Sequence, residues 1–199
     1  MPSDLLKGLR LLDLTDEKGA LCGKMFADLG AEVIKVEPPT GCSTRRIPPY
    51  LEDKADPEHC LYSIAYHAGK KSVTANFATD DGRALVADLA AHSDFLVESH
   101  PLGYLESIGL GYDTLARKNP RLIYASITPF GDTGPGKDYN WADIITWAAG
   151  GSTLITSAPR SANILPHSAP FSSVKSSSRN PLSNSDGIGD EPRETRAHA

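Results

Sequence analysis

The sequence predicts an α/β fold, a Rossmann-like doubly wound parallel sheet, and three observations support it. Short apolar segments rich in β-branched residues alternate, over residues 1–156, with segments whose apolar side chains recur at helical spacing. The connections are mostly short, as in βαβ units with right-handed crossovers. Glycine and proline stand where helices and strands should end, as at Gly30, Pro38 and Gly150. Such alternation is typical of an open parallel sheet.

The first βαβ unit has the clearest pattern. Residues 9–15 (LRLLDLT) form a continuous apolar run suited to a strand buried on both faces. Residues 19–29 carry apolar side chains at helical spacing, and Gly30 stands where a helix C-terminus favours glycine. The β-branched run at 32–37 (EVIKVE) predicts the second strand, which Pro38-Pro39 ends.

The remaining elements follow by the same criteria. Residues 41–68 are polar and proline-rich with no clear period, so we expect a long functional or surface loop. Asp80 is the expected N-cap of the helix that follows. We predict strands at 72–77, 94–98 and 122–128 and helices at 80–91, 112–118 and 139–149, the last preceded by a Gly/Pro loop at 131–136.

The composition changes at residue 157. Residues 157–199 hold ten serines and five prolines, and their large apolar residues are few and scattered. Too little apolar surface is available there to offset the entropy of ordering the chain. We therefore predict a folded part at 1–156 and a disordered tail at 157–199.

Bulk properties exclude several classes of function. A net charge of −5 without a Lys/Arg run argues against nucleic-acid binding. No apolar run is long enough to span a membrane, and Asp4 argues against a signal peptide. Three widely spaced cysteines predict reduced thiols and a cytoplasmic location. We expect no metal site and interpret the histidines without ligand spacing as surface residues; these are His59, His67, His92 and His167.

Single motifs leave alternatives open. Gly19 and Gly23 in the first strand–helix turn lack the G-x-G-x-x-G pattern, which disfavours a dinucleotide site even though Glu37 ends the second strand where a ribose-binding acid would stand. Residues 70–72 (KKS) could meet a phosphate or form a solvated turn. Residues 98–101 (ESHP) follow a strand at the edge where such sheets bind ligands. Asp143 is either a solvent-facing carboxylate or part of a site.

Five segments, in order, resemble one family. They are G-L-R-L-L-D-L-T (8–15), A-D-L-G-A-E-V-I-K-V-E-P-P (27–39), G-K-K-S-V-T (69–74), L-G-Y-L-E-S-I-G-L-G-Y-D-T-L (102–115) and N-P-R-L-I-Y-A-S-I-T-P-F-G-D-T-G-P (119–135). Together they are similar to the class III CoA-transferases, which include formyl-CoA and carnitine-type CoA-transferases and alpha-methylacyl-CoA racemases. The resemblance covers about residues 5–156 and does not separate transferase from racemase chemistry.

The resemblance implies a CoA thioester as substrate, no other cofactor, and an aspartate that carries the acyl group and then CoA. It also implies an interlocked homodimer of chains about twice this length. By position, the resemblance places the CoA contacts on four stretches. The first two are the first strand–helix turn, with Lys18 and Gly19, and a strand end, with Ala75, Asn76, Phe77 and Ala78. The other two are a loop, with Ser99, His100 and Pro101, and the segment that enters the last helix, with Tyr139, Asn140, Trp141 and Ala142. Asp143 matches a supporting carboxylate.

Departures from the family pattern leave two alternatives for the function of this chain. Basic residues of the family are replaced here by Pro38, Ala78 and Ser107. The family's nucleophilic aspartate follows the double glycine by about twenty residues, whereas here the next carboxylate is Asp186, in a stretch without the family pattern (DGIGD) that also holds Asp190. The chain is thus either the front of a working CoA-transferase or a truncated, non-catalytic fragment that binds CoA or a full-length homologue.

Overall fold

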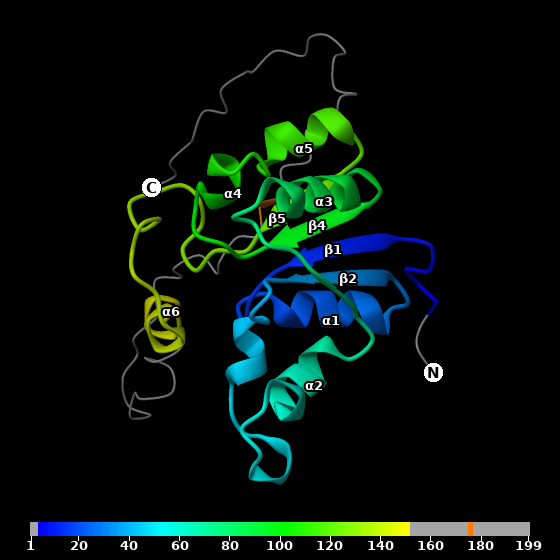
Figure 1. The fold of residues 1–199 in the computed structure, drawn as a ribbon. Coiled ribbons are helices and arrows are strands. Elements are labelled where there is room, and N and C mark those ends of the chain that lie inside the picture. Colours follow the sequence, from blue (N-terminus) through cyan, green and yellow to red (C-terminus); the bar gives the residue numbers. More distant parts are fainter. Residues whose placement is uncertain (1–3, 152–174, 177–199) are drawn as a thin grey trace, which may run out of the picture.

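A computed structural model describes residues 4–151 and 175–176 of the chain. Its sheet has the order β3-β2-β1-β4-β5-β6, and the first five strands run parallel (Figure 1). The strands are β1 (Arg10–Leu14), β2 (Glu32–Glu37), β3 (Lys71–Thr74), β4 (Phe95–Glu98), β5 (Ile123–Ser126) and the short antiparallel β6 (Lys175–Ser176). The predicted Rossmann-like parallel sheet is confirmed, and its strand order is the one common in dinucleotide-binding folds.

Helices cover both faces of this sheet (Figure 1). The helix α1 lies on one face, and α3 and α5 lie on the other. The helices are α1 (Ala20–Asp28), α2 (Leu61–His67), α3 (Asp80–Ala91), α4 (Tyr104–Ser107), α5 (Tyr112–Lys118) and α6 (Asp143–Ala149), with short 3-10 helices at Ser43–Arg46, Leu51–Asp53 and Pro57–His59. The fold is therefore α/β with both sheet faces covered.

Alternating side chains of β1 build two separate cores. Leu12 and Leu14 point to one face, where they meet Val86 of α3 and Leu115 of α5. Leu11 points to the other face and joins a cluster packed against α1. A period of two along a strand sends successive side chains to opposite faces, which explains why the run reads as continuously apolar.

One predicted N-cap and one predicted helix start are wrong, whereas the helix predicted at 80–91 has the bounds of α3. Thr79, not Asp80, caps α3, because its Oγ1 accepts a hydrogen bond from the backbone N–H of Gly82 at 3.2 Å. Asp80 is the first helical residue, where a carboxylate is also favourable. The last helix begins at Asp143 and not at residue 139. Residues 139–142 lie outside the helix, and Ala142 directly before it has an extended backbone.

The segment at 41–68 is not one long loop. It contains the three 3-10 helices and α2, which the sequence did not predict. The buried Cys60 caps α2, since its Sγ accepts from the backbone N–H of Ser63 at 3.4 Å. His67 is half-buried and shares a 2.8 Å hydrogen bond with Thr44. The interpretation of His67 as a surface residue is therefore wrong, and burial lowers its pKa to about 4.

The predicted tail at 157–199 lies outside the described residues, apart from 175–176, and so does His167. Among the described residues, no helix combines the length and the hydropathy that crossing a bilayer would need.

Candidate functional site

The strand order reverses direction between β1 and β4, and the loops that follow these strands separate there. Open α/β sheets bind ligands in the crevice outside such a point. Here the two loops are tied by one side chain. Ser99 Oγ accepts a hydrogen bond from the backbone N–H of Asp16 at 2.8 Å and donates one to Asp16 Oδ1 at 2.7 Å. Residues 83 positions apart thus form one rigid edge.

Lys18 connects this edge to the segment before α6. Its ammonium forms an ion pair with the Asp16 carboxylate and lies 4.7 Å from the centroid of the Trp141 ring. The Lys18 side chain is 15% exposed, so the cation is partly sheltered. A cation over an indole face is an attractive contact that grows as water is removed. The first turn and the 139–142 stretch are therefore adjacent.

An aromatic row continues along the same edge. Phe77, which follows β3, lies 5.8 Å from the His100 ring, and His100 stacks on Tyr104 at 5.3 Å between centroids. The backbone N–H of His100 donates to Glu98 Oε2 at 2.7 Å, which holds the loop after β4 against its own strand. The row offers flat ring faces at the carboxyl ends of β3 and β4.

All four stretches predicted from the resemblance meet at this edge. The contacts Asp16–Ser99, Lys18–Trp141 and Phe77–His100 join them into one continuous chain. Seven of the predicted positions are exposed: Asn76, Ala78, Pro101, Tyr139, Asn140, Trp141 and Ala142. Tyr139 packs edge-on against Phe130, whereas Gly19, Ala75 and Ser99 are buried and serve to shape the edge. Asp143 is exposed at the first turn of α6.

Neither interpretation of Lys70 is correct, because its ammonium is buried beneath the edge. Lys70 Nζ lies 2.8 Å from Asp13 Oδ2, and Lys35 Nζ lies 3.2 Å from Asp13 Oδ1, with all three side chains at most 2% exposed. Burial alone would raise the pKa of Asp13, but Lys35 and Lys70 hold it below the ordinary value. The three side chains form an internal ion cluster that no solvent phosphate reaches.

Gly23 is required by this cluster. A Cβ at Gly23 would lie 2.3 Å from Asp13 Oδ2 and 2.8 Å from Lys70 Nζ, closer than atoms can pack. Similarly, a Cβ at Gly19 would lie 2.5 Å from Thr15 Cγ2. These glycines let α1 approach β1, and they are not a pyrophosphate-binding loop.

The carboxylate of Glu37 is also bound by neighbouring side chains of the protein. Arg45 Nε and Nη2 donate to its two carboxylate oxygens at 2.6 and 2.9 Å, and Ser72 Oγ donates to Oε1 at 2.8 Å. The Arg45 guanidinium is the main cause that lowers the pKa of Glu37 to about 2. A ribose-binding acid must have free oxygens, so this geometry argues against that interpretation of Glu37.

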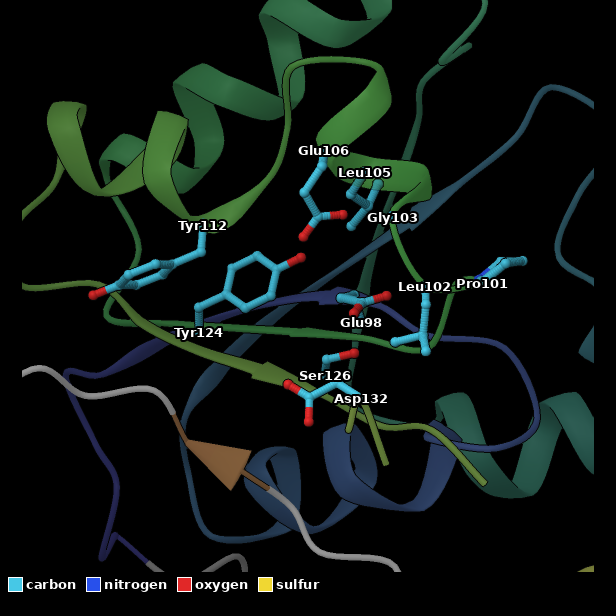
Figure 2. Close-up of a pocket in the computed structure, with 10 residues that line it drawn as sticks. All are labelled: Glu98, Pro101, Leu102, Gly103, Leu105, Glu106, Tyr112, Tyr124, Ser126 and Asp132. Carbon is cyan, nitrogen blue, oxygen red and sulfur yellow. The ribbon is translucent and has the colours of Figure 1, made fainter. Parts of the chain in front are cut away.

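A cavity next to this edge was missed by sequence reasoning. A cavity of about 290 Å³ lies beneath α4, between the end of β4 and β5 (Figure 2). The residues that line it are Glu98, Pro101, Leu102, Gly103, Leu105, Glu106, Tyr112, Tyr124, Ser126 and Asp132. The sequence signal was present only at residues 98–101, because the other side chains come together through the packing of α4 on β5.

The described residues contain no group of three His, Cys, Asp or Glu side chains arranged to hold a metal ion. Cys22 is half-buried and Cys42 and Cys60 are buried, all as free thiols. Burial is the main cause that raises the pKa of Cys22, so its thiol is protonated at neutral pH.

Comparison with known proteins adds independent information. The model of CoA-transferase family III matches residues 6–174. The chain is 41% identical over 160 residues to the succinate–glutarate CoA-transferase of Agrobacterium fabrum, an alignment of 77% of this chain and 40% of that protein. It is 40% identical over 142 residues to a succinyl-CoA:(R)-benzylsuccinate CoA-transferase subunit, BbsE, of Thauera aromatica, covering 71% and 35% of the two chains.

Similar solved structures support the same family. A CAIB/BAIF family protein from Brucella suis superposes with a TM-score of 0.69 at 39% identity, over 76% of this chain and 40% of that one. The protein Rv3272 from Mycobacterium tuberculosis gives 0.67 at 34% identity, over 86% and 46%. The chain thus spans less than half the length of the relatives it matches.

Proposed function

Because the chain belongs to CoA-transferase family III, we propose that it forms the N-terminal part of a CoA-transferase and binds the CoA portion of a thioester. The binding site is the carboxyl edge of the sheet at the β1/β4 junction. The observation that carries this proposal is that four stretches far apart in sequence meet there through Asp16–Ser99, Lys18–Trp141 and Phe77–His100. CoA combines an adenine ring with phosphates, so it needs flat ring faces and a cation on one surface.

Each part of the edge has a role in this proposal. The stacked rings of His100 and Tyr104 receive the adenine, since aromatic faces stack on a purine without regard to sequence. Lys18 supplies the cation for a phosphate, and Trp141 holds the Lys18 ammonium in position. Pro38, Ala78 and Ser107 replace cations that the resemblance leads one to expect, so affinity for CoA is modest.

The proposed reaction exchanges CoA between carboxylates. An aspartate attacks the thioester carbonyl, CoA leaves as a thiolate, and a mixed anhydride forms. The thiolate then attacks the aspartyl carbonyl, which releases the first acid and leaves an aspartyl-CoA thioester. The acceptor carboxylate repeats these two steps in reverse order. Covalent catalysis of this kind divides one slow exchange into faster steps.

This chain alone lacks the aspartate for that sequence of steps. Between Asp143 and Asp186 the sequence contains no Asp or Glu, although the resemblance places the nucleophile about twenty residues after Gly151. We therefore propose that the 199-residue chain binds CoA without transferring it. Asp143 remains a candidate supporting carboxylate, and the interlocked homodimer and the cytoplasmic location remain predictions.

The test has two arms on the purified 199-residue chain. Binding of CoA is measured by calorimetry for the unchanged chain and for Lys18→Met and His100→Ala, with the exposed Glu52→Gln as control. We expect saturable binding that each site variant weakens about tenfold and the control leaves unchanged. Transfer is measured with succinyl-CoA and a free carboxylate, with hydroxylamine added to trap an aspartyl adduct.

The arms separate the two parts of the proposal. A folded chain that does not bind CoA contradicts the site. CoA exchange or a trapped adduct contradicts the absence of a nucleophile, and peptide mapping of the adduct would then show whether Asp186 or Asp190 carries it. Binding without exchange supports both parts.

A further inference from the structure

The cavity beneath α4 is distinct from the proposed CoA edge. It shares only Pro101 with the predicted CoA-binding stretches, and its floor is formed by β4 and β5 (Figure 2). Its volume of about 290 Å³ is near the lower end of the range of about 300–1,000 Å³ that is usual for ligand pockets. The cavity therefore accommodates a small molecule.

The charge of the cavity is negative on all sides. Glu98 on β4, Glu106 on α4 and Asp132 after β5 line it, and among the described residues that line it none is Lys, Arg or His. Glu98 is 6% exposed, and outside the lining the Nδ1 atom of His100 lies 3.7 Å from its Oε2. Carboxylates gathered around a low-dielectric space repel one another, and a bound cation relieves that repulsion.

A buried polar group points into the same space. Tyr124 is 6% exposed, and within the described part of the chain its hydroxyl has no hydrogen-bond partner. Figure 2 shows this hydroxyl directed towards the carboxylate of Glu106 across the cavity. This hydroxyl can therefore donate a hydrogen bond to a ligand or a water in the cavity. Burial, followed by Glu98 and Glu106, raises the pKa of Tyr124.

The arrangement distinguishes an organic cation from a metal ion. The acidic side chains do not converge as ligands of one ion within the described residues. Instead they are spread around a space also lined by the rings of Tyr112 and Tyr124 and by Leu102 and Leu105. Aromatic faces attract ammonium groups, and leucines favour methyl or methylene groups. We propose that this cavity binds a small organic ammonium, with the positive nitrogen among the carboxylates and its alkyl groups on the tyrosine rings.

The test compares choline with 3,3-dimethyl-1-butanol, which replaces the quaternary nitrogen of choline by carbon and is otherwise nearly identical in shape. Binding to the full 199-residue chain is measured by ligand-observed NMR and calorimetry in the absence of CoA, so the result does not depend on the proposed CoA site. We expect choline to bind about tenfold more tightly than the neutral compound. Equal affinities, or no binding of choline to the folded chain, would overturn the proposal.

A pair of matched variants locates the effect. Glu106→Gln removes one cavity carboxylate from an exposed position on α4, and we expect it to weaken choline binding about fivefold while leaving the neutral compound unchanged. Glu52→Gln makes the same change at an exposed residue in a different segment and should alter neither. Loss of choline affinity in both variants alike would contradict the assignment to this cavity, as would no loss in Glu106→Gln.

Discussion

Carboxylates on the two halves of the sheet have opposite surroundings. On the β1–β2–β3 half, Asp13 contacts two lysines and Glu37 contacts an arginine. On the β4–β5 half, Glu98 and its neighbours surround a cavity whose described lining contains no basic residue. Both sets are brought together by the same parallel sheet. The first half therefore pairs its buried carboxylates with lysine or arginine, whereas the second half gathers carboxylates around a cavity.

This comparison assigns different consequences to the same kind of substitution. Removing one partner of a buried ion pair leaves an uncompensated charge away from water, which is strongly destabilising. Removing a carboxylate from an acidic cavity removes repulsion instead, so the fold keeps its stability and only binding changes. Measurements of unfolding free energy for variants in both halves of the sheet therefore test this comparison.

The largest effect is expected at Asp13. Asp13→Ala leaves the buried Lys35 and Lys70 without a counter-charge, and we expect the free energy of unfolding to fall by about 3–5 kcal/mol in urea denaturation. Lys70→Met is the matched comparison, because it keeps the Asp13–Lys35 pair and should cost less. A loss below about 1 kcal/mol for Asp13→Ala would contradict a structural role for the cluster.

The next largest effect is the acid sensitivity that Glu37 confers. The pKa of Glu37 is lowered from 4.5 to about 2 in the folded protein, chiefly by Arg45. The ion pair therefore contributes its full stability above pH 4.5 and loses it as the pH falls from about 4.5 to 2, a total of about 3 kcal/mol. Urea unfolding at successive pH values should show this slope, and Glu37→Gln should flatten it. An identical slope in both proteins would show that other groups cause the acid sensitivity.

The smallest effect is expected in the cavity. Glu106→Gln should change the free energy of unfolding by less than about 1 kcal/mol, in contrast to Asp13→Ala, because Glu106 is exposed and lines a cavity that holds two other carboxylates. Thermal and urea unfolding of the two variants under one set of conditions provides the comparison. Destabilisation of Glu106→Gln by several kcal/mol would mean that this half of the sheet also depends on its charges.

Local patterns predicted much of the fold. The run at 32–37 has both the β-branched composition and the proline boundary of a strand, and β2 has those bounds. The exposed α6 was harder, because the two tryptophans at 141 and 147 look equally suited to a helix face although only Trp147 lies within the helix. The seven-residue α2 was missed because it is too short to show a period.

The candidate site was predictable only where residues close together in sequence determine its structure. The resemblance placed four stretches at one edge, and strand order explains why they meet. Lys70 illustrates the limit, because its partner Asp13 is 57 residues away in sequence. A lysine beside a strand has the same sequence pattern whether it meets solvent or a buried aspartate. Tyr124 and Glu106 likewise approach each other only through tertiary packing (Figure 2).

The two tryptophans of the chain allow a direct test of the proposed CoA edge, since Trp141 contacts Lys18 there and Trp147 lies on α6. In Trp147→Phe, Trp141 is the only tryptophan, and its fluorescence lifetime is followed during titration with CoA. We predict a saturable change in lifetime for Trp147→Phe and a much smaller one for the converse variant, Trp141→Phe. No saturable change in a folded Trp147→Phe chain, or equal changes in both variants, would contradict a CoA site at the β1/β4 edge.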